Sequence, residues 1–155
     1  MTPPRITLRR AGEHDADLLF EWRNDPDAVR FSVSGQPVTR EDHERWFAMR
    51  RDDPSVHLWI ADEHGIPVAQ VRVDVVPPAG VVSVAVAVSH RGRGLGSEVL
   101  RAMVSEIAED DRVRVLRALV HPDNAHSIRA FERAGFHRSG DIEGGFNVLL
   151  RTVGS

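Results

Sequence analysis

The chain contains no cysteine and no tyrosine, and no lysine occurs anywhere in its 155 residues. Without cysteine there can be no disulfide, no thiolate zinc site and no catalytic thiol. All 20 basic residues are therefore arginine, which excludes a Schiff-base lysine and the lysine of a Walker loop. The absence of tyrosine excludes a tyrosine general acid. Acid–base chemistry is left to histidine and carboxylate side chains.

Charge and hydropathy restrict the partners. The formal net charge of −3 argues against a nucleic-acid binder, which normally carries an excess of basic residues. No window approaches the roughly eighteen unbroken apolar residues of a membrane span, and Met1–Arg5 lacks the apolar run of a signal peptide. We therefore expect a single domain over residues 1–155 that is cytoplasmic and has neither a nucleic-acid nor a membrane partner.

Hydrophobic periodicity predicts strands alternating with helices. Strands are expected at 5–9, 56–61, 66–76, 81–88, 113–120, 136–138 and 146–152, and helices at 11–24, 40–51, 95–109 and 125–134. This order predicts a mixed, mostly antiparallel α/β sheet of about seven strands flanked by four helices. The run 81–88 is apolar on both faces, so we expect it at the centre of the sheet, covered on both sides.

A glycine-rich turn, Arg91-Gly92-Arg93-Gly94-Leu95-Gly96, separates this apolar strand from the next helix. Glycines let backbone N–H groups approach a ligand closely, and the N-terminus of a helix favours phosphate. A Walker loop would require Lys-Ser/Thr after the last glycine, which Ser97 alone does not supply. A dinucleotide-binding loop and a turn that binds no ligand also stay open at this point. By itself the turn predicts an anion site.

Two segments in order resemble the signatures of one family. The run Val86–Gly96 resembles the coenzyme-A signature Arg/Gln-x-x-Gly-x-Gly/Ala of the GNAT N-acetyltransferases, which follows their fourth strand. About thirty residues on, Asn124–Phe136 resembles their second signature, Asn-x-x-Ser/Ala-x-x-x-Tyr/Phe-Glu-Lys/Arg-x-Gly-Phe. The resemblance covers nearly the whole chain. It implies a sheet splayed between strands four and five and acetyl-CoA as the acetyl donor. The eight histidines show no His-x-x-x-His or His-x-x-Glu-His spacing, so we expect no metal site.

The same resemblance implies which residues hold acetyl-CoA. Backbone groups of Val86 and Val88 would lie along the pantetheine arm, with an unpaired N–H near Val88 on the acetyl oxygen. The amides of Arg91–Gly96 would hold the pyrophosphate. The full predicted cofactor set is Val86, Ala87, Val88, Arg91, Gly92, Arg93, Gly94, Leu95, Gly96, Ser97, Asn124, Ser127, Phe131 and Arg133.

The proton transfers are harder to assign. Many relatives have tyrosine at the position of Phe131 and use its hydroxyl to protonate the leaving thiolate. Here Ser127, His126 or water substitutes, or the thiolate leaves unassisted; Phe131 is equally well interpreted as a core aromatic. Candidates for the base are Asp74, His90, His43 and Glu41, each of which is also an ordinary surface residue type. We take Asp74, His90 and Ser127 as the catalytic candidates.

The first third of the chain predicts the acceptor side. Trp22-Arg23-Asn24-Asp25, followed by a loop and by His-x-x-Trp-Phe at 43–47, resembles the acetyltransferases of nucleotide-linked amino-sugar pathways of the pseudaminic-acid type. The predicted substrate residues are Trp22, Arg23, Asn24, Arg30, Phe31, His43 and Trp46. Arginines suit a diphosphate, and aromatic rings suit a base or sugar face. A protein N-terminus of the ribosomal type, another small amine, or an inactive coenzyme-A-binding module would also fit. The sequence is compatible with a homodimer.

Overall fold

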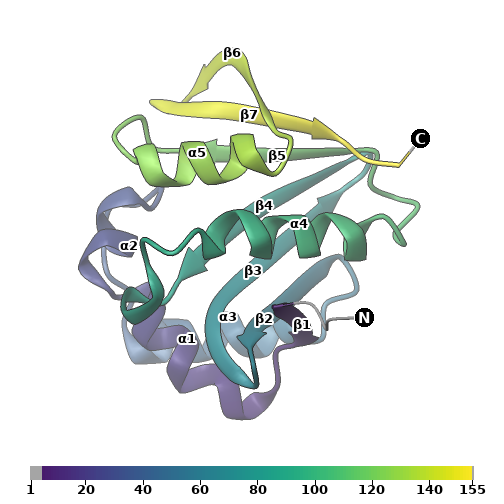
Figure 1. The fold of residues 1–155 in the computed structure, drawn as a ribbon. Helices are drawn as coiled ribbons and strands as arrows, with labels where there is room; N and C mark the ends of the chain where they lie inside the picture. The colour runs from purple at the N-terminus through teal and green to yellow at the C-terminus, as the bar shows by residue number, and fades with distance from the viewer. Residues whose placement is uncertain (1–4, 155) are drawn as a thin grey trace.

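The computed structural model describes residues 5–154, which form one seven-stranded sheet with helices on both faces (Figure 1). In chain order the elements are β1 Ile6–Arg10, η1 Glu13–Asp15, α1 Ala16–Arg23, α2 Pro26–Phe31, α3 Arg40–Arg51, β2 Val56–Glu63, β3 Ile66–Val76, β4 Ala79–Val86, η2 Val88–His90, α4 Leu95–Ile107, β5 Val115–Val120, α5 Ala125–Arg133, β6 His137–Glu143 and β7 Phe146–Thr152. The strand order is β1-β2-β3-β4-β5-β7-β6. Neighbouring strands are antiparallel except β4 and β5, which are parallel. The predicted mixed α/β fold is confirmed.

The two faces of the sheet carry separate cores. On one face α4 and α5 pack on β3 and β5, burying Val71, Val73, Leu100 and Met103 with little or no exposure. On the other face α1 and α3 cover β2, where Leu19 and Phe47 contact the strand's alternate residues. Side chains of a strand alternate between its faces, so a single strand contributes to both cores.

The sheet separates between β4 and β5. Their parallel pairing extends only from Ala79 opposite Val115 to Val82 opposite Ala118. Among residues 5–154, Ser83–Val86 have no strand partner on the β5 side, and these residues are half-buried. The half-burial of 83–86 and the exposure of Val88 show that the second half of 81–88 is less covered than predicted. The strand lies at the centre of the sheet, but its neighbour diverges; we call this gap the splay.

The predicted elements differ from the observed ones mainly near the N-terminus. The helix expected over 11–24 begins only at Ala16, and a further helix, α2, follows in a stretch for which the sequence predicts no element. Asp25 explains α2, because its side chain accepts a hydrogen bond from the N–H of Ala28 and Pro26 occupies the first helical position. Thr39 accepts from the N–H of Asp42 and begins α3 as predicted.

The helices pack on the two faces of the sheet. Across residues 5–154, no helix has both the length and the apolar character that crossing a membrane requires.

Candidate active site

The glycine-rich turn leads from the end of β4 into α4. Gly92 and Gly94 have φ angles of 79° and 74°, in the left-handed region that favours glycine. Gly94 is the N-cap of α4, and no side chain caps the helix there. A Cβ at either glycine would meet nothing within 4 Å. The turn therefore presents the first amides of a 13-residue helix to open space, as an anion site requires.

Gly96 serves a different purpose from the other two glycines. A Cβ added there would lie 3.2 Å from the Cβ of Ala130 on α5 and 3.9 Å from Cγ2 of Val86. Gly96 therefore lets α4 and α5 approach closely just below the turn. This contact joins the two segments that resemble the family signatures.

Arg91 connects the turn to the acceptor side of the molecule. Its Nε donates to the carbonyl oxygen of Val86 at 3.0 Å, its Nη2 pairs with Asp25 at 2.8 Å, and its Nη1 pairs with Asp27 at 3.2 Å. We call these contacts the Arg91 bridge. Burial alone would raise the pKa of Asp25, but hydrogen bonds from Arg91 and the N–H of Ala28 outweigh it and hold the pKa below its ordinary value.

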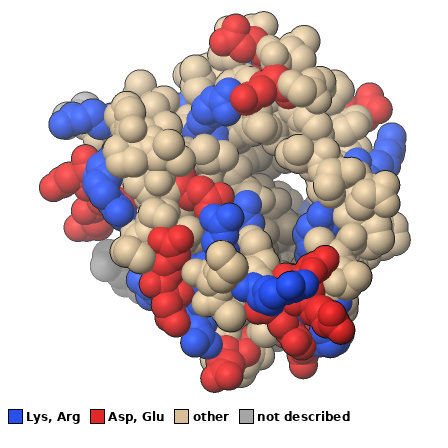
Figure 2. Space-filling view, turned by 180° about the vertical axis from the view of Figure 1, so that it is seen from behind, with Lys and Arg blue, Asp and Glu red and all other residues tan. Residues whose placement is uncertain are grey.

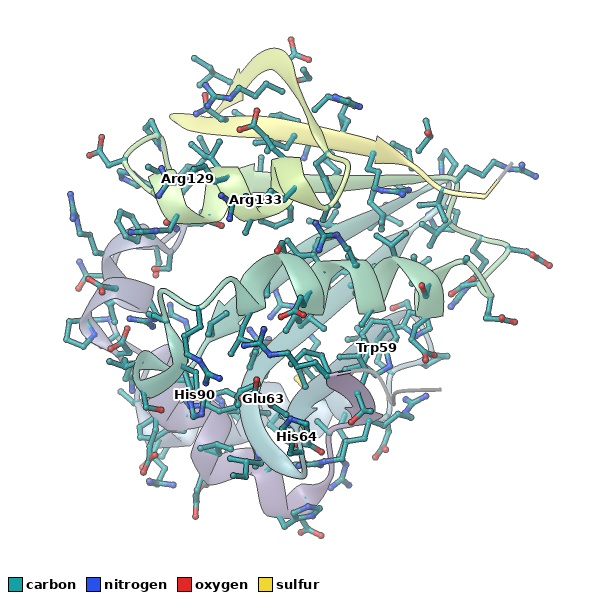
Figure 3. All side chains as sticks on the ribbon, in the orientation of Figure 1. Trp59, Glu63, His64, His90, Arg129 and Arg133 are labelled. Atoms are coloured by element: carbon teal, nitrogen blue, oxygen red, sulfur yellow. The ribbon has the colours of Figure 1, made fainter. Side chains whose placement is uncertain are left out.

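Arg93 is also paired within the protein. Its guanidinium lies 3.2 Å from Glu63, which also accepts a 2.6 Å hydrogen bond from Arg5. Figure 3 places Glu63 and His64 at the end of β2 and His90 beside the turn. From the sequence, the charges of Arg91 and Arg93 are expected at the pyrophosphate. Both guanidiniums form ion pairs in this structure, so their backbone amides remain the predicted contacts.

Along 83–86, the edge of β4 that faces the splay has backbone N–H and C=O groups without a strand partner among residues 5–154. The N–H of Ala87 donates to the carbonyl oxygen of Val68 on the β3 side. Backbone groups alternate along an antiparallel strand, so those of Val84 and Val86 point the other way, into the splay. The carbonyl of Val86 is already taken by Arg91. In Figure 2, seen from the face opposite α4, an opening passes through the molecule, in the region between α2 and β4 and below α5 in Figure 1.

The second predicted signature forms the N-terminal part of α5. Asn124 is the N-cap, and its side-chain oxygen accepts from the N–H of Ser127 at 3.2 Å, so its amide nitrogen stays available. Phe131 is 2% exposed and packs edge-on against Phe136, with ring centroids 4.9 Å apart. The core interpretation of Phe131 therefore fits the structure well. Arg133 extends from the exposed side of α5, as Figure 3 shows.

The catalytic candidates lie in different places. His90 is next to the turn, where its Nδ1 lies 2.8 Å from Oγ of Ser89. Asp74 lies opposite Val81, where β4 and β5 are still paired, and two arginines contact it. Each of its two oxygens is engaged by an arginine, so the geometry gives Asp74 less support than His90. Ser127 lies half-buried in the first turn of α5. All three roles remain predictions.

The predicted acceptor residues of α1 mainly shape the following loop. The side-chain amide of Asn24 donates to the carbonyl oxygen of Val38 and accepts from its N–H, both at 2.8 Å. Nη2 of Arg23 donates to Oγ of Ser34 at 3.3 Å and to the carbonyl oxygen of Gln36 at 3.1 Å. These contacts hold the loop between α2 and α3, and they occupy both polar groups of the Asn24 side chain.

The aromatic acceptor candidates form two groups. His43 is buried between Phe20 and Trp46; burial lowers its pKa, and the charges of Arg40 and Arg23 lower it further. His43 is therefore a core residue of α3 and a poor candidate for the base. Trp22 packs against the same core and is half-buried.

Phe31 belongs to the second group. Its ring lies 5.3 Å from that of His121 at the end of β5, and His121 in turn packs edge-on against Phe146. Arg30 supports this contact by pairing with Asp123 at 3.7 Å. These residues connect α2 to β5 across the end of the splay.

His121 lies at the end of the splay beside Phe31 and is therefore a candidate site residue, one that the sequence pattern does not identify. Continuing the β4–β5 register by three residues from Val82 and Ala118 sets His121 opposite Ala85, across the splay. Its Nδ1 accepts the backbone N–H of Asp123 at 3.1 Å, so the proton of the neutral ring is on Nε2. Its position directly after a predicted strand of the parallel pair is the signal that could have found it.

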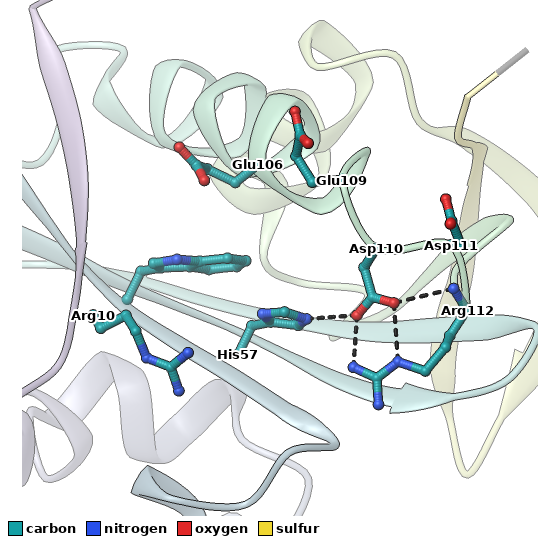
Figure 4. A pocket seen from close by; sticks show the side chains of 8 residues that line it. Arg10, His57, Glu106, Glu109, Asp110, Asp111 and Arg112 are labelled. Atoms are coloured by element: carbon teal, nitrogen blue, oxygen red, sulfur yellow. Dashed lines mark hydrogen bonds and ion pairs between the residues drawn. The ribbon is translucent and has the colours of Figure 1, made fainter.

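A separate hollow lies at the other end of α4 (Figure 4). Its lining residues are Arg10, His57, Trp59, Glu106, Glu109, Asp110, Asp111 and Arg112. Asp110 accepts hydrogen bonds there from His57 and Arg112, and His57 stacks on Trp59. These contacts join α4 to β2 and lie outside the turn and the splay. Within residues 5–154, no group of three or more His, Asp or Glu side chains could hold a metal ion.

Comparison with known proteins decides the family. Residues 5–137 match the family model described as an acetyltransferase (GNAT) domain. The chain belongs to the GNAT acetyltransferase family. It is thus an acetyl-CoA-dependent N-acetyltransferase, as predicted, which removes the alternative of an unrelated nucleotide-binding loop.

Individual relatives show how broad this family is. An aminoglycoside N(6')-acetyltransferase of Klebsiella pneumoniae is 27% identical over 88% of this chain and 76% of its own length. A putative phosphinothricin acetyltransferase of Bacillus subtilis is 31% identical over 90% of this chain and 88% of its own. The structure of the aminoglycoside acetyltransferase AAC(6')-Ib with ribostamycin and coenzyme A superimposes with a TM-score of 0.80 at 26% identity, covering 95% of this chain and 93% of that one. These relatives are not named for pseudaminic-acid synthesis, so that specific resemblance is not shown.

Proposed function

We propose that this GNAT enzyme acetylates the primary amine of a small amino sugar, with acetyl-CoA bound in the splay. The observation that carries the proposal is the separation of β4 from β5 directly before an uncapped, glycine-rich helix N-terminus. The separation leaves a strand edge without a partner, and the turn leaves amides without a partner. The two lie next to each other along the chain, as an arm and its pyrophosphate require.

The residues present fit the cofactor. The first amides of α4, beyond Gly94, would hold the pyrophosphate, and the remaining backbone groups of Val84 and Val86 would lie along the arm as a neighbouring strand does. Asn124 has an amide nitrogen to spare, and Ser127 lies one turn inside the same helix. When bound, acetyl-CoA supplies an activated acetyl group as a thioester.

The chemistry demands a neutral amine and a polarised carbonyl. An N–C bond forms and the C–S bond breaks, so the sulfur takes the electron pair and the nitrogen loses a proton. Backbone N–H groups at the end of β4 are suited to polarising the carbonyl oxygen, because they are oriented by the sheet. His90 lies beside the turn and remains the candidate base, acting through water.

An amino-sugar acceptor is supported by the walls of the opening and by relatives. The half-buried ring of Phe31 stands at the end of the splay, next to His121. Concave sites for small molecules commonly combine aromatic walls with a few polar groups. The aminoglycoside acetyltransferases named above act on amino sugars, and the nucleotide-linked amino sugar that the sequence predicts belongs to the same chemical class.

The experiment is thiol release from acetyl-CoA across a panel of amines. The panel contains amino sugars with and without phosphate, aminoglycosides, phosphinothricin, spermidine and a peptide with a free N-terminus. We expect turnover with amino sugars and little with the peptide. Stabilisation by coenzyme A without turnover on any member would instead indicate a binding module. Peptide turnover exceeding that of every sugar would replace the proposed acceptor with a protein N-terminus.

A further inference from the structure

Three arginines gather near one carboxylate on the face of the sheet opposite α4. Asp74 accepts a hydrogen bond from Nε of Arg72 at 3.1 Å and another from Nη1 of Arg50 at 3.4 Å. Arg23, at the end of α1, is close enough for the charge of Arg72 to lower its pKa, although burial is the larger cause. One carboxylate cannot neutralise three guanidiniums. Arg50 also interacts with Asp53, so the excess of positive charge is local to the surroundings of Asp74.

The register of the strands places Arg72 beside the splay. Arg72 is paired with Ser83 of β4, and Gln70 is paired with Ala85. Ser83 and Ala85 belong to the part of β4 that has no partner on its other side. Neighbouring strands are about 4.8 Å apart, so Arg72 starts roughly one strand spacing from the splay. The side chains of Ser83 and Ala85 are small, so they do not block the path from Arg72 to the splay.

The guanidinium of Arg72 has hydrogen-bond donors without a partner among residues 5–154. Its guanidinium lies 5.2 Å from the centre of the Trp46 ring, and its side chain is 26% exposed. Of the contacts within residues 5–154, only Nε of Arg72 has a hydrogen-bond partner, so both terminal nitrogens remain free. Nearby, Nη1 of Arg23 and Oε1 of Gln70 are buried without any partner. Buried polar atoms are normally satisfied, so this region is incomplete as it stands.

We propose that the acceptor amine carries an anionic group, which binds at the Arg72 subsite formed by Arg23, Arg50 and Arg72. The inference rests on the proposed function and specifies its substrate class. The terminal nitrogens of Arg72 form a planar fork that matches a phosphate or a carboxylate in two parallel hydrogen bonds. Arg50 adds charge from α3, and Arg23 adds charge from beneath the loop.

The same charge assists the reaction. An ammonium group near several guanidiniums loses its proton more readily, because like charges disfavour the charged form. Arginine charge that the bound anion leaves unneutralised would therefore favour the neutral amine and assist the proposed base, His90. For the same reason it disfavours polycationic acceptors. On this proposal the acceptor is an amino sugar that also carries an acidic group, unlike the polycationic aminoglycosides for which some relatives are named.

The test compares two amines that differ only in the anionic group, glucosamine and glucosamine 6-phosphate. We expect kcat/KM to be about tenfold or more higher for the phosphate, the size of a charge-assisted hydrogen-bond pair. Arg72→Gln should abolish most of this preference, and Arg72→Lys should retain part of it. Arg45→Gln, which removes an exposed arginine from the outer side of α3, should leave the preference intact. Phosphinothricin tests whether carboxylate or phosphinate groups bind as well as phosphate.

Calorimetry of glucosamine 6-phosphate binding to the coenzyme-A complex gives a readout that does not depend on turnover. Binding that Arg72→Gln weakens about tenfold while Arg45→Gln does not would support the subsite even if no amine is acetylated. Equal kcat/KM for the two sugars, together with no turnover of phosphinothricin, would overturn it. Binding that is insensitive to Arg72→Gln and Arg72→Lys in a folded protein would do the same. Failure of the proposed function would appear differently, as no thiol release with any amine.

Discussion

The Arg91 bridge leads to a quantitative prediction for Asp25→Asn. Asp25 has a side chain only 13% exposed, and its Oδ2 lies 2.8 Å from Nη2 of Arg91. The same oxygen accepts the N–H of Ala28 at 3.2 Å, so Asp25 both caps α2 and holds the guanidinium. Asparagine keeps the shape and an oxygen that can cap the helix, while it removes the charge and replaces the other oxygen with NH2. The substitution therefore tests mainly the ionic part of the bridge.

The loss of stability expected for Asp25→Asn depends on the partners that Arg91 keeps. A hydrogen bond to a charged group contributes about 1.5–3 kcal/mol. Arg91 keeps two of its three partners, Asp27 and the carbonyl oxygen of Val86, so the loss should fall at about 1–2 kcal/mol. For a domain of this size that lowers Tm by about 2–8 °C. Because Arg91 also holds the end of β4, we expect KM for the acceptor to rise more than kcat falls.

The assay is thermal and urea unfolding of the wild type and the variant at pH 7. Asp17→Asn is the matched control, because Asp17 is 83% exposed and also pairs with one arginine, Arg40; its loss should stay within about 0.5 kcal/mol. A double-mutant cycle with Arg91→Gln should give a coupling of about 0.5 kcal/mol or more. Strict additivity in that cycle, or an Asp25→Asn effect no larger than the control, would refute the reasoning.

The pH dependence provides an independent check of the same pair. The pKa of Asp25 is lowered in the folded protein, so its stabilising contribution is fully present above the unfolded value near 4. The contribution is lost as the pH falls through the folded pKa. The stability gap between wild type and Asp25→Asn should therefore be constant near neutrality and shrink below about pH 4.

Three further outcomes are expected. Gly94→Asp should keep the fold, because aspartate tolerates the left-handed region, and should weaken acetyl-CoA binding about tenfold or more by calorimetry through like-charge repulsion; Gly94→Asn should bind better than Gly94→Asp. Gly96→Val should destabilise the protein by about 1–3 kcal/mol in urea unfolding, since its Cβ alone approaches that of Ala130 to 3.2 Å. Asp110→Asn should destabilise the protein most near pH 7. The hydrogen bond from Arg112 outweighs burial and holds the pKa of Asp110 well below its ordinary value. The difference in Tm between wild type and variant should therefore disappear as the pH falls through that lowered pKa.

Local pattern is sufficient to predict most of the fold. The alternation in 66–76 and the cap at Thr39 give β3 and α3 with the bounds that the structure shows. One exception is β6, which is expected over 136–138 and extends over His137–Glu143. Another is α2, a six-residue helix with no buried side chain of its own. So short a helix has little periodicity to detect, and the Asp25-Pro26 pair that begins it also marks the end of the preceding helix.

The site is predictable where backbone chemistry determines it. Gly92 and Gly94 adopt the positive φ angles that their spacing suggests, and the helix starts where the turn ends. Side-chain partners across the fold are not predictable in this way, because they depend on residues far apart in sequence. Arg91 is expected from the sequence to bind the cofactor's phosphates, yet its partners Asp25 and Asp27 are more than sixty residues away. The ring contacts of His121 with Phe31 and Phe146 likewise join residues far apart in sequence.

The leaving sulfur presents a final constraint that the charge pattern helps to explain. Phe131 packs in the core against Phe136, and the chain has no tyrosine to protonate the thiolate. A thiol has an ordinary pKa near 8.5, so a thiolate is a modest leaving group that solvent can protonate after departure. The difficulty then shifts to the amine, which must be neutral when it attacks. Positive charge at Arg72 and its neighbours that the acceptor's anionic group leaves unneutralised would act on that side of the reaction, together with the proposed base His90.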